Sequence, residues 1–283
     1  MAIYYMDGTF VPETEATLPV SDLIILRGYG VFDFLRTYGG RPFHLDAHIR
    51  RLLNSARLIG LACPWRFQEI KDIVTETMAR NNFPEATVRL LITGGDSADS
   101  ITPGEKPRLL IMVNALKTFP EAWYATGVKI RTADVTRFIP GAKSIDYIRG
   151  IIALHEAHRI GAVEAIYVDD RGRVLEGTTS NIFAVIDGQL VTPPDDILPG
   201  VTRDVTLDLV RPHTAPQLRA LTRTELYRAE EVFLSSSNKE ILPVVQVDGE
   251  IIGSGSPGAM TRKIMGLFRD YTTGYASGRT TGE

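Results

Sequence analysis

The stretch 141–183 constrains the fold more than any other part of the sequence, because it combines a helix pattern, two strand patterns and polar residues at their ends. Lys143 lies just before a helix pattern that starts at Tyr147. Glu176 ends a strand–turn–strand pattern that starts at Ala165, and small hydroxyl-bearing residues follow it. The sequence therefore places an amine, a phenol and a carboxylate at the ends of elements, and this set of groups suits a pyridine cofactor.

Length and composition place the chain among ordinary globular proteins. Its 283 residues predict about two domains, and 44% hydrophobic with 23% charged residues is typical of a packed core and a hydrated surface. The net charge of −3 gives no indication of nucleic acid or an anionic membrane as a partner. No apolar run reaches the roughly 18 residues of a membrane span, and the single cysteine, Cys63, favours a cytoplasmic location.

An irregular stretch at 117–126 separates two groups of periodic segments. We predict a smaller N-terminal α/β domain over 1–116, an interdomain loop over 117–126, and a larger C-terminal domain over 127–283 with a mixed, barrel-like sheet. In the first domain we expect a hairpin with strands over 3–6 and 9–11 and its turn at Asp7-Gly8, further short strands up to residue 45, helices over 48–60 and 67–81, and strands over 87–93 and 109–115. In the second domain we expect a helix over 204–210.

Five motifs occur in an order that resembles that of the class IV aminotransferases, which are pyridoxal-phosphate enzymes of fold type IV. This family includes branched-chain aminotransferases, D-amino acid transaminases and aminodeoxychorismate lyases. The resemblance spans roughly the whole chain and implies an α/β (α+β) fold with two domains. It also implies a homodimer with active sites at its interface, and amino acids and 2-oxo acids as substrates. The motifs are Lys143-Ser-Ile-Asp-Tyr147, Gly161-Ala-Val-Glu-Ala165, Glu176-Gly-Thr-Thr-Ser-Asn181, His48-x-x-Arg51-Leu-x-x-Ser-Ala56 and Leu198-x-Gly-Val-Thr-Arg203.

The resemblance also implies roles for individual residues. Lys143 would be the catalytic amine that bonds to pyridoxal 5′-phosphate and carries the substrate's proton. Glu176 would face the pyridine nitrogen and Tyr147 the phenolate oxygen. Arg51 and Thr202 would bind the phosphate, although the residues alone also fit a solvated helix face for Arg51 and a helix cap for Thr202. The full cofactor-binding set is Arg51, Lys143, Tyr147, Glu176, Thr179, Ser180, Val201, Thr202, Ser236 and Ser237.

Three residues are the predicted substrate ligands, namely Arg27, Tyr29 and Arg89. An arginine binds a carboxylate bidentately, so Arg27 and Arg89 are candidate carboxylate clamps, with structural ion pairs as the alternative. Branched-chain enzymes typically carry a tyrosine where Thr87 lies, and the turn 235–237 is serine-rich as in D-amino acid transaminases. We therefore predict D-amino acids such as D-alanine or D-glutamate as donors and 2-oxoglutarate as acceptor. A branched-chain L-amino acid aminotransferase and an aminodeoxychorismate lyase are the alternatives.

A G-x-G-x-x-G pattern at Gly253–Gly258 raises a different class of function, a non-catalytic nucleotide-binding protein. No strand–helix–strand pattern surrounds it, so we predict a turn before a C-terminal helix over 259–271. The five histidines show no H-E-x-x-H spacing, and we predict no metal site.

Overall fold

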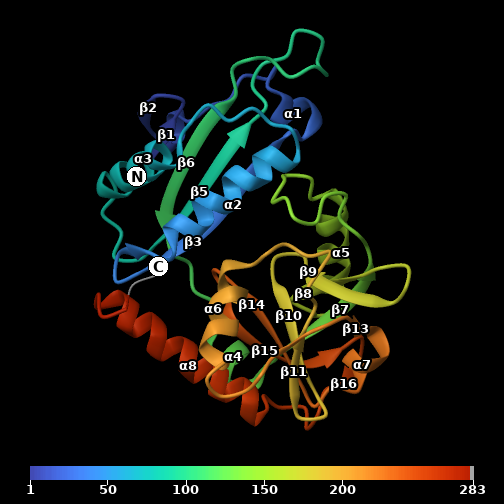
Figure 1. Cartoon of the computed structure of the whole chain (residues 1–283). Coiled ribbons are helices and arrows are strands. Elements are labelled where there is room, and N and C mark those ends of the chain that lie inside the picture. Colours follow the sequence, from blue (N-terminus) through green and yellow to red (C-terminus); the bar gives the residue numbers. More distant parts are fainter. Residues whose placement is uncertain (281–283) are drawn as a thin grey trace. The chain divides into compact units, whose positions relative to one another are not determined.

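The computed structural model describes residues 1–280, and it divides into two compact units (Figure 1). The first unit contains Met1–Lys117, Gly141–Asp146 and the chain from Thr273 onward. The second unit contains Thr118–Pro140 and Tyr147–Thr272. The segment that carries Lys143 therefore belongs to the first unit, although the second unit precedes and follows it in the sequence.

The first unit contains an antiparallel sheet with the strand order β2-β1-β6-β5-β3-β4. The β1–β2 hairpin turns at Asp7-Gly8 as predicted, and both residues adopt the positive φ that this turn requires. The strands are β1 (Ile3–Met6), β2 (Thr9–Pro12), β3 (Gly30–Tyr38), β4 (Arg41–Pro42), β5 (Ala86–Thr93) and β6 (Arg108–Ala115).

Two helices cover one face of this sheet. Helix α2 (Leu45–Leu58) packs on β3, and α3 (Phe67–Ala79) packs on β6 and β1 (Figure 1). The side chains of β3 alternate, so that Val31, Asp33 and Leu35 are buried while Phe32 is only partly covered. An acidic residue on the buried face of a strand needs partners within the core. The unit also contains a 3-10 helix, η1 (Glu13–Glu15), and the short helix α1 (Leu23–Arg27).

The second unit contains a mixed sheet that closes on itself. Six strands pair in the order β10-β14-β15-β7-β8-β9, and a further pairing of Asn181 with Glu176 joins β9 back to β10. Strand β7 runs parallel to both β15 and β8, and the other pairs of this ring are antiparallel. This confirms the predicted mixed, barrel-like sheet. The strands are β7 (Val128–Asp134), β8 (Glu164–Val168), β9 (Arg173–Gly177), β10 (Asn181–Ile186), β11 (Gln189–Thr192), β12 (Gln217–Leu218), β13 (Leu221–Thr222), β14 (Glu231–Ser236), β15 (Glu240–Val247) and β16 (Glu250–Ile251).

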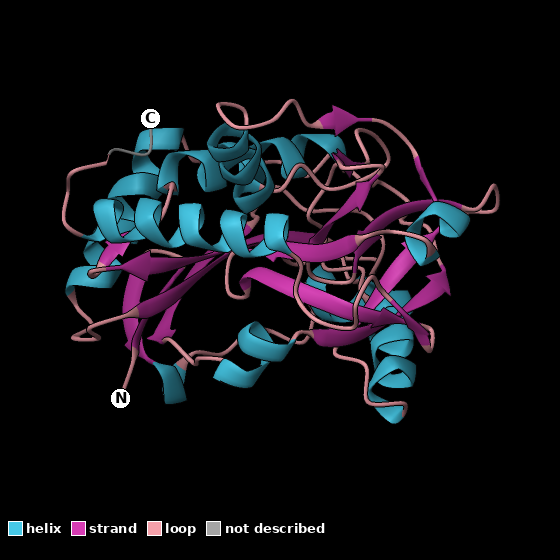
Figure 2. Cartoon of the chain, turned by 90° about the horizontal axis from the view of Figure 1, so that it is seen from below, coloured by secondary structure: helices cyan, strands magenta, loops and turns pink. Residues whose placement is uncertain are grey.

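Helices flank the strands of each unit (Figure 2). Residues 121–126 were predicted as part of an irregular loop, but they form α4 (Glu121–Thr126). Pro120 precedes its first turn, and Trp123 and Tyr124 pack against the barrel core, so tertiary burial stabilises a helix too short to show a period. The remaining helices are α5 (Ile148–Arg159), α6 (Val201–Val210), α7 (Arg223–Tyr227) and α8 (Ala259–Ala276).

Other boundaries differ from the sequence-based expectation in ways that matter for the site. Helix α6 starts at Val201, not at Asp204, so Val201 and Thr202 lie in its first turn. Gly253–Gly258 links the antiparallel β15–β16 hairpin to α8, so this glycine pattern does not lie within a strand–helix–strand unit. Helix α8 is longer than predicted, because Ile264, Phe268 and Tyr275 keep one of its faces buried past residue 271.

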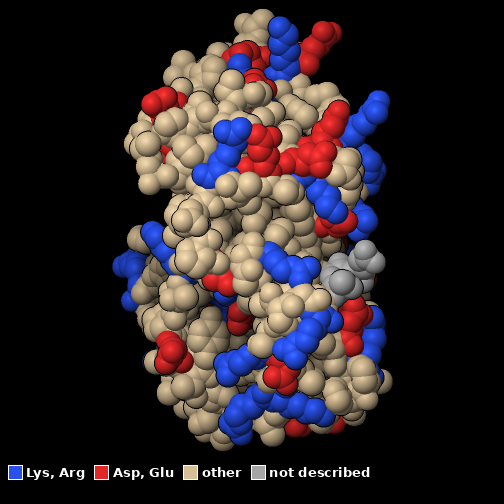
Figure 3. All heavy atoms as spheres, turned by 90° about the vertical axis from the view of Figure 1, so that its left-hand side faces the viewer, with Lys and Arg blue, Asp and Glu red and all other residues tan. Residues whose placement is uncertain are grey.

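The described surface matches the near-neutral composition. Uncharged residues cover most of the face shown in Figure 3, and both acidic and basic side chains occur on it. Within residues 1–280, no helix has the length and apolar character needed to cross a membrane. The same residues contain no cluster of three or more His, Cys, Asp or Glu side chains that could hold a metal ion.

Candidate active site

Lys143 lies on a segment that pairs with the edge of β3 in the first unit. The Phe32 amide donates to the Lys143 carbonyl at 2.9 Å, and Ser144 forms a bridge with Val31. From the other side, the Lys143 amide donates to Ser55 Oγ of α2 at 2.9 Å. The main chain of Lys143 is thus fixed by both a strand and a helix. Its side chain extends over the Phe32 ring, with Nζ 4.7 Å from the ring centroid.

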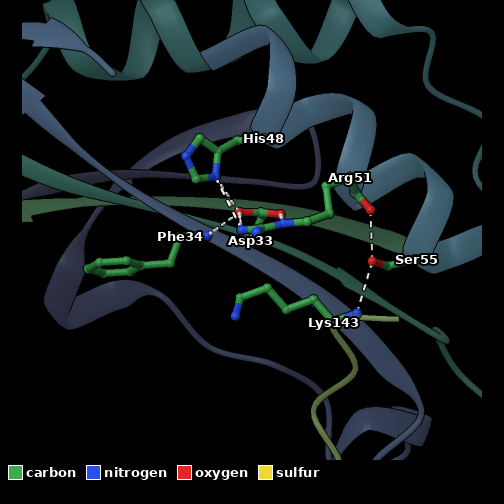
Figure 4. Close-up of polar contacts among 6 residues, drawn as sticks. All are labelled: Asp33, Phe34, His48, Arg51, Ser55 and Lys143. Carbon is green, nitrogen blue, oxygen red and sulfur yellow. Dashed lines mark hydrogen bonds and ion pairs between the residues drawn. The ribbon is translucent and has the colours of Figure 1, made fainter. Parts of the chain in front are cut away.

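A buried cluster of charged residues lies beside this lysine (Figure 4). Arg51 donates from Nε to Asp33 Oδ2 at 2.8 Å and from Nη2 to Oδ1 at 2.7 Å. His48 Nδ1 lies 2.6 Å from the same Oδ1, which also accepts from the Phe34 amide at 2.7 Å. Ser55 Oγ donates to the Arg51 carbonyl and so connects this arginine to Lys143. We call Asp33, His48, Arg51, Ser55 and Lys143 the amine cluster.

The contacts within the amine cluster set the protonation of Asp33 and His48. Burial alone would raise the pKa of Asp33, but Arg51 and His48 lower it well below its usual value, so the carboxylate is ionised at neutral pH. Burial lowers the pKa of His48, and Asp33 only partly opposes this. Since an ionised Asp33 can only accept, the neutral His48 ring must donate from Nδ1. Its Nε2 is buried and has no hydrogen-bond partner among residues 1–280.

The three predicted substrate residues lie in different environments of the first unit. Arg89 is exposed on β5, with its guanidinium 5.1 Å from the Phe32 centroid and 5.4 Å from that of Phe34. The Lys143 amine and the Arg89 guanidinium therefore both lie against the Phe32 ring. Arg27, at the end of α1, is exposed and donates to the Leu26 carbonyl. The Tyr29 hydroxyl donates to the Ile59 carbonyl at 3.2 Å, and burial raises its pKa, which is the behaviour of a structural tyrosine.

Glu176 lies where the barrel of the second unit closes, and its side chain is buried. Arg137 Nη1 donates to its Oε1 at 3.1 Å and to the Pro140 carbonyl at 3.0 Å. The Leu198 amide donates to Oε2 at 3.0 Å. A buried carboxylate is costly unless charged or hydrogen-bonded groups compensate it, and here an arginine and a backbone amide do so.

Asn181, at the other end of the same motif, fixes the turn that leads into α6. Its Nδ2 donates to the Leu198 carbonyl at 2.9 Å. A Cβ atom at Gly200 would lie 1.9 Å from Asn181 Oδ1, so only glycine fits this position. We call Glu176, Arg137, Leu198, Asn181 and Gly200 the carboxylate cluster. It joins the barrel closure to the start of α6.

The first turn of α6 has the properties of an anion site. Gly200 precedes the helix, no side chain caps its amides, and the adjoining Val201 and Thr202 are buried. Uncapped amides and the helix dipole together favour a negatively charged group at such an end. Arg203, also buried, donates to the Pro193 carbonyl at 2.9 Å and so holds the helix on the chain that follows β11.

Tyr147 precedes α5 and lies close to the carboxylate cluster. Burial raises the pKa of the neighbouring Tyr167 strongly, and Tyr147 and Glu176 add to this effect. A Cβ atom at Gly150 would lie 2.6 Å from the Tyr167 hydroxyl and 3.5 Å from the Tyr147 ring. Tyr147, Tyr167 and Glu176 therefore occupy one region of the second unit.

Two hydroxyl-rich turns complete the predicted set. Thr179 and Ser180 lie between β9 and β10 and both donate to Glu164 Oε2, at 2.8 and 3.3 Å. Ser236 ends β14, and its hydroxyl lies 3.3 Å from Asn238 Oδ1. Ser237 follows it and is partly exposed. Since Ser235 pairs with Asn181 across β14 and β10, both turns lie at the same end of adjacent strands.

Several residues of these clusters were not found from the sequence. Asp33 had a usable signal, since it interrupts an alternating apolar pattern on a strand. Arg137 and Lys239 had none, because Arg137 lies in a stretch without a regular pattern and Lys239 is one polar residue within the polar stretch 235–240. The other lysines that could replace Lys143 differ from it. Lys129 is exposed on β7, and Lys239 is buried in an ion pair with Glu164.

Known proteins resemble this chain over nearly its whole length. The sequence model of the family "Amino-transferase class IV" matches residues 30–247. A putative branched-chain-amino-acid aminotransferase of Methanocaldococcus jannaschii is 36% identical over 95% of this chain and 96% of its own length. A D-alanine aminotransferase of Listeria monocytogenes is 31% identical over 95% of both chains. The solved structure of a T.th. branched-chain amino acid aminotransferase with pyridoxamine 5′-phosphate superimposes with a TM-score of 0.89. It is 27% identical and covers 99% of this chain and 95% of its own.

The family model covers most of the chain, and the relatives match nearly all of it. The motifs that carry the resemblance form the edge segment of Lys143, the barrel closure at Glu176 and the first turn of α6. The chain belongs to the class IV aminotransferases.

Proposed function

We propose that the protein is a pyridoxal-phosphate-dependent transaminase that moves an amino group from an amino acid to a 2-oxo acid by a ping-pong mechanism. The observation that carries this proposal is the buried Glu176 carboxylate, which Arg137 and the Leu198 amide hold at the barrel closure. A fixed, buried anion of this kind stabilises a proton on a pyridine nitrogen.

The donor set fits pyridoxal phosphate in each of its parts. The uncapped first turn of α6, with Val201 and Thr202, suits a phosphate, and Ser236 and Ser237 add hydroxyl groups. Arg51, the predicted phosphate ligand, donates from Nε and Nη2 to Asp33, so this carboxylate fixes the direction of its guanidinium. Four residues separate Lys143 from Tyr147, so the chain limits the distance between their Cα atoms to about 14 Å.

Each residue has a defined task in the proposed mechanism. When bound, pyridoxal phosphate supplies an aldehyde that bonds to amines and an electron sink for the substrate's Cα. Lys143 would hold the cofactor and then move the proton at the substrate's Cα. Glu176 would keep the pyridine nitrogen protonated, and Arg137 would keep Glu176 in place. The Tyr147 hydroxyl would donate to the cofactor's phenolate oxygen.

Arg89 is the favoured ligand of the substrate's α-carboxylate. It lies against the same Phe32 ring as the Lys143 amine, and a guanidinium binds a carboxylate bidentately. The predicted preference for D-amino acids is not confirmed, since relatives of both kinds match the chain. The aromatic rings of Phe32 and Phe34 beside Arg89 favour a donor with an apolar side chain. We therefore place branched-chain L-amino acids ahead of D-alanine and D-glutamate.

Two further proposals concern the assembly and its location. A homodimer is supported by Ile148, Ile151 and Ile152 of α5, which are 70%, 64% and 56% exposed and form one apolar patch. Sedimentation of the wild type against Ile151→Lys would test this. A cytoplasmic location is supported by the single cysteine, Cys63, and localisation of a tagged chain would test it.

Absorbance spectroscopy and steady-state kinetics test the function. Purified protein supplied with pyridoxal phosphate should show the visible band of a lysine-bound cofactor, and an amino donor without acceptor should bleach it. The values of kcat/KM for L-leucine, D-alanine and D-glutamate, each measured with 2-oxoglutarate as acceptor, then identify the preferred amino donor. Release of pyruvate from aminodeoxychorismate without any acceptor would identify a lyase instead.

A further inference from the structure

A lysine is buried in the second unit outside the predicted set. Lys239 is 8% exposed, and its Nζ lies 2.6 Å from Glu164 Oε2, which is fully buried. A buried ion pair contributes little to net stability, because the cost of removing two charges from water offsets their attraction. The presence of this pair therefore calls for a role other than stability.

The ion pair connects segments that are separate in the sequence. Glu164 begins β8, Thr179 lies in the turn between β9 and β10, and Lys239 lies in the turn between β14 and β15. Lys239 Nζ donates to Thr179 Oγ1 at 2.6 Å, and Thr179 Oγ1 donates to Glu164 Oε2 at 2.8 Å. Ser180 Oγ donates to the same carboxylate oxygen at 3.3 Å. One oxygen of Glu164 thus gathers three donors.

This arrangement determines what Thr179 can do. A hydroxyl has one hydrogen to donate, and that of Thr179 is directed to Glu164. Its oxygen can accept a further bond, but it cannot donate to a phosphate or a carboxylate while the pair is intact. The side chain of Thr179 is therefore an anchor for its turn.

Lys239 is bonded to the other hydroxyl-rich turn as well. Its amide donates to Ser236 Oγ at 3.3 Å, while its side chain reaches Thr179. Lys239 is thus one residue that holds both turns, the first through its ammonium group and the second through its backbone.

We propose that Lys239 is a positioning residue that, together with Glu164, locks the Thr178–Ser180 and Ser235–Ser237 turns into one unit and so sets how they bind the cofactor's phosphate and the substrate. This inference rests on the proposed function. Because misplacement by about 1 Å costs on the order of a hundredfold in rate, a joint anchor for two binding turns has a measurable effect.

The test removes the ion pair without leaving a charge unpaired. Lys239→Met alone would leave the Glu164 carboxylate buried without a cation, so the main variant is Lys239→Met with Glu164→Gln. We expect the melting temperature of the cofactor-free protein to stay close to that of the wild type. We also expect the Kd for pyridoxal phosphate to rise about tenfold or more and kcat/KM to fall by about ten- to a hundredfold. The 31P chemical shift of the bound phosphate should change as well. Lys239→Arg keeps a cation beside Glu164, so this variant should keep most of the wild-type affinity and kcat/KM.

Two further variants complete the design. Thr179→Val removes only the bridging hydroxyl and leaves both charges, so it decides the question if the double variant does not fold. We expect it to change Kd and the 31P shift in the same direction, by a smaller amount. Lys129→Met, on an exposed lysine of β7, is the matched control and should behave as wild type.

The positioning role would be overturned if a folded double variant kept the wild-type values of Kd, 31P shift and kcat/KM. If only Thr179→Val folds, the same result in that variant would overturn it. In both cases the proposed function stands. Wild-type protein that binds no pyridoxal phosphate would overturn both proposals.

Discussion

The two units hold their buried carboxylates in different ways. In the amine cluster, Asp33 accepts from Arg51 on both oxygens and also from His48 and the Phe34 amide. In the carboxylate cluster, Glu176 accepts from Arg137 on one oxygen and from the Leu198 amide on the other. Asp33 thus holds an arginine and a histidine of α2 in place, whereas Glu176 lies where the barrel closes, between an arginine and the amide that leads into α6. Burial of a carboxylate alone does not reveal which of these two roles it has.

Replacing the amine tests whether the first unit supplies the reacting group. Lys143→Ala should lower kcat by at least about a thousandfold, because the amine acts both as nucleophile and as proton carrier. Borohydride reduction of the wild type with pyridoxal phosphate, followed by peptide mapping, should locate the label on Lys143. Lys129→Ala, on an exposed lysine, should keep full activity. A label on Lys129 or Lys239 would contradict the assignment.

Removing the charge of Asp33 tests its structural role. Asp33→Asn should lower the free energy of unfolding by about 3 kcal/mol or more, because Arg51 is left buried without its anion. Urea denaturation measures this change. The control is Asp46→Asn, whose ion pair with Lys71 is partly exposed and should contribute less than about 1 kcal/mol. An equal loss of unfolding free energy in Asp33→Asn and Asp46→Asn would show that the buried Asp33 contributes no more to stability than an exposed ion pair.

Removing the charge of Glu176 should give the opposite balance between activity and stability. Glu176→Gln should lower kcat by about a hundredfold, since the pyridine proton loses its anionic partner. Its effect on unfolding should be smaller than that of Asp33→Asn, because Arg137 keeps its bond to the Pro140 carbonyl. Steady-state kinetics and urea denaturation give both values, with Glu250→Gln on the exposed β16 as control. Unchanged turnover would show that another group serves the cofactor.

The smallest expected effect is the change in stability with pH that His48 causes. Burial lowers the pKa of His48 below its usual value of about 6.5, so the unfolded chain binds a proton more readily than the folded one. Stability should therefore fall as the pH drops from about 7 towards 5, by up to about 1.4 kcal/mol per pH unit. Asp33, whose pKa is also lowered, adds to this loss only as the pH falls below about 4.

Urea midpoints at pH 7 and at about pH 5.5 isolate the contribution of His48. The difference between the two midpoints should be smaller in His48→Asn than in the wild type, since the asparagine does not titrate. His155→Asn, on an exposed histidine of α5, should keep the wild-type difference. A wild-type difference in His48→Asn would assign the pH dependence to other groups.

The sequence predicted the elements well where a pattern is long. The β1–β2 hairpin, α3 and the strands β5 and β6 lie within a residue or two of the expected ranges. It failed at α4, whose six residues are held by packing of Trp123 and Tyr124. A short helix of this kind depends on contacts with distant residues, and a local pattern does not contain them.

The candidate site was predicted in its motif residues only. Lys143, Glu176 and Thr202 are predicted site residues because they lie in motifs, and the start of α6 at Val201 places Thr202 in the first turn of that helix. The cations that pair with the buried carboxylates of the second unit were not found, because Arg137 lies 39 positions from Glu176 and Lys239 lies 75 from Glu164. Such pairs form only when the barrel closes, so they cannot be derived from neighbours along the chain.

The pairing of the Lys143 segment with β3 has a consequence for the order of folding. The bridge between Val31 and Ser144 closes a very long loop of chain, and such contacts form late because their entropic cost comes before their gain. We therefore expect the lysine to reach its final position only after the sheet of the first unit has formed and the intervening chain has returned to it. Uptake of the cofactor should then follow the last steps of refolding, and its rate would report when the native topology is complete.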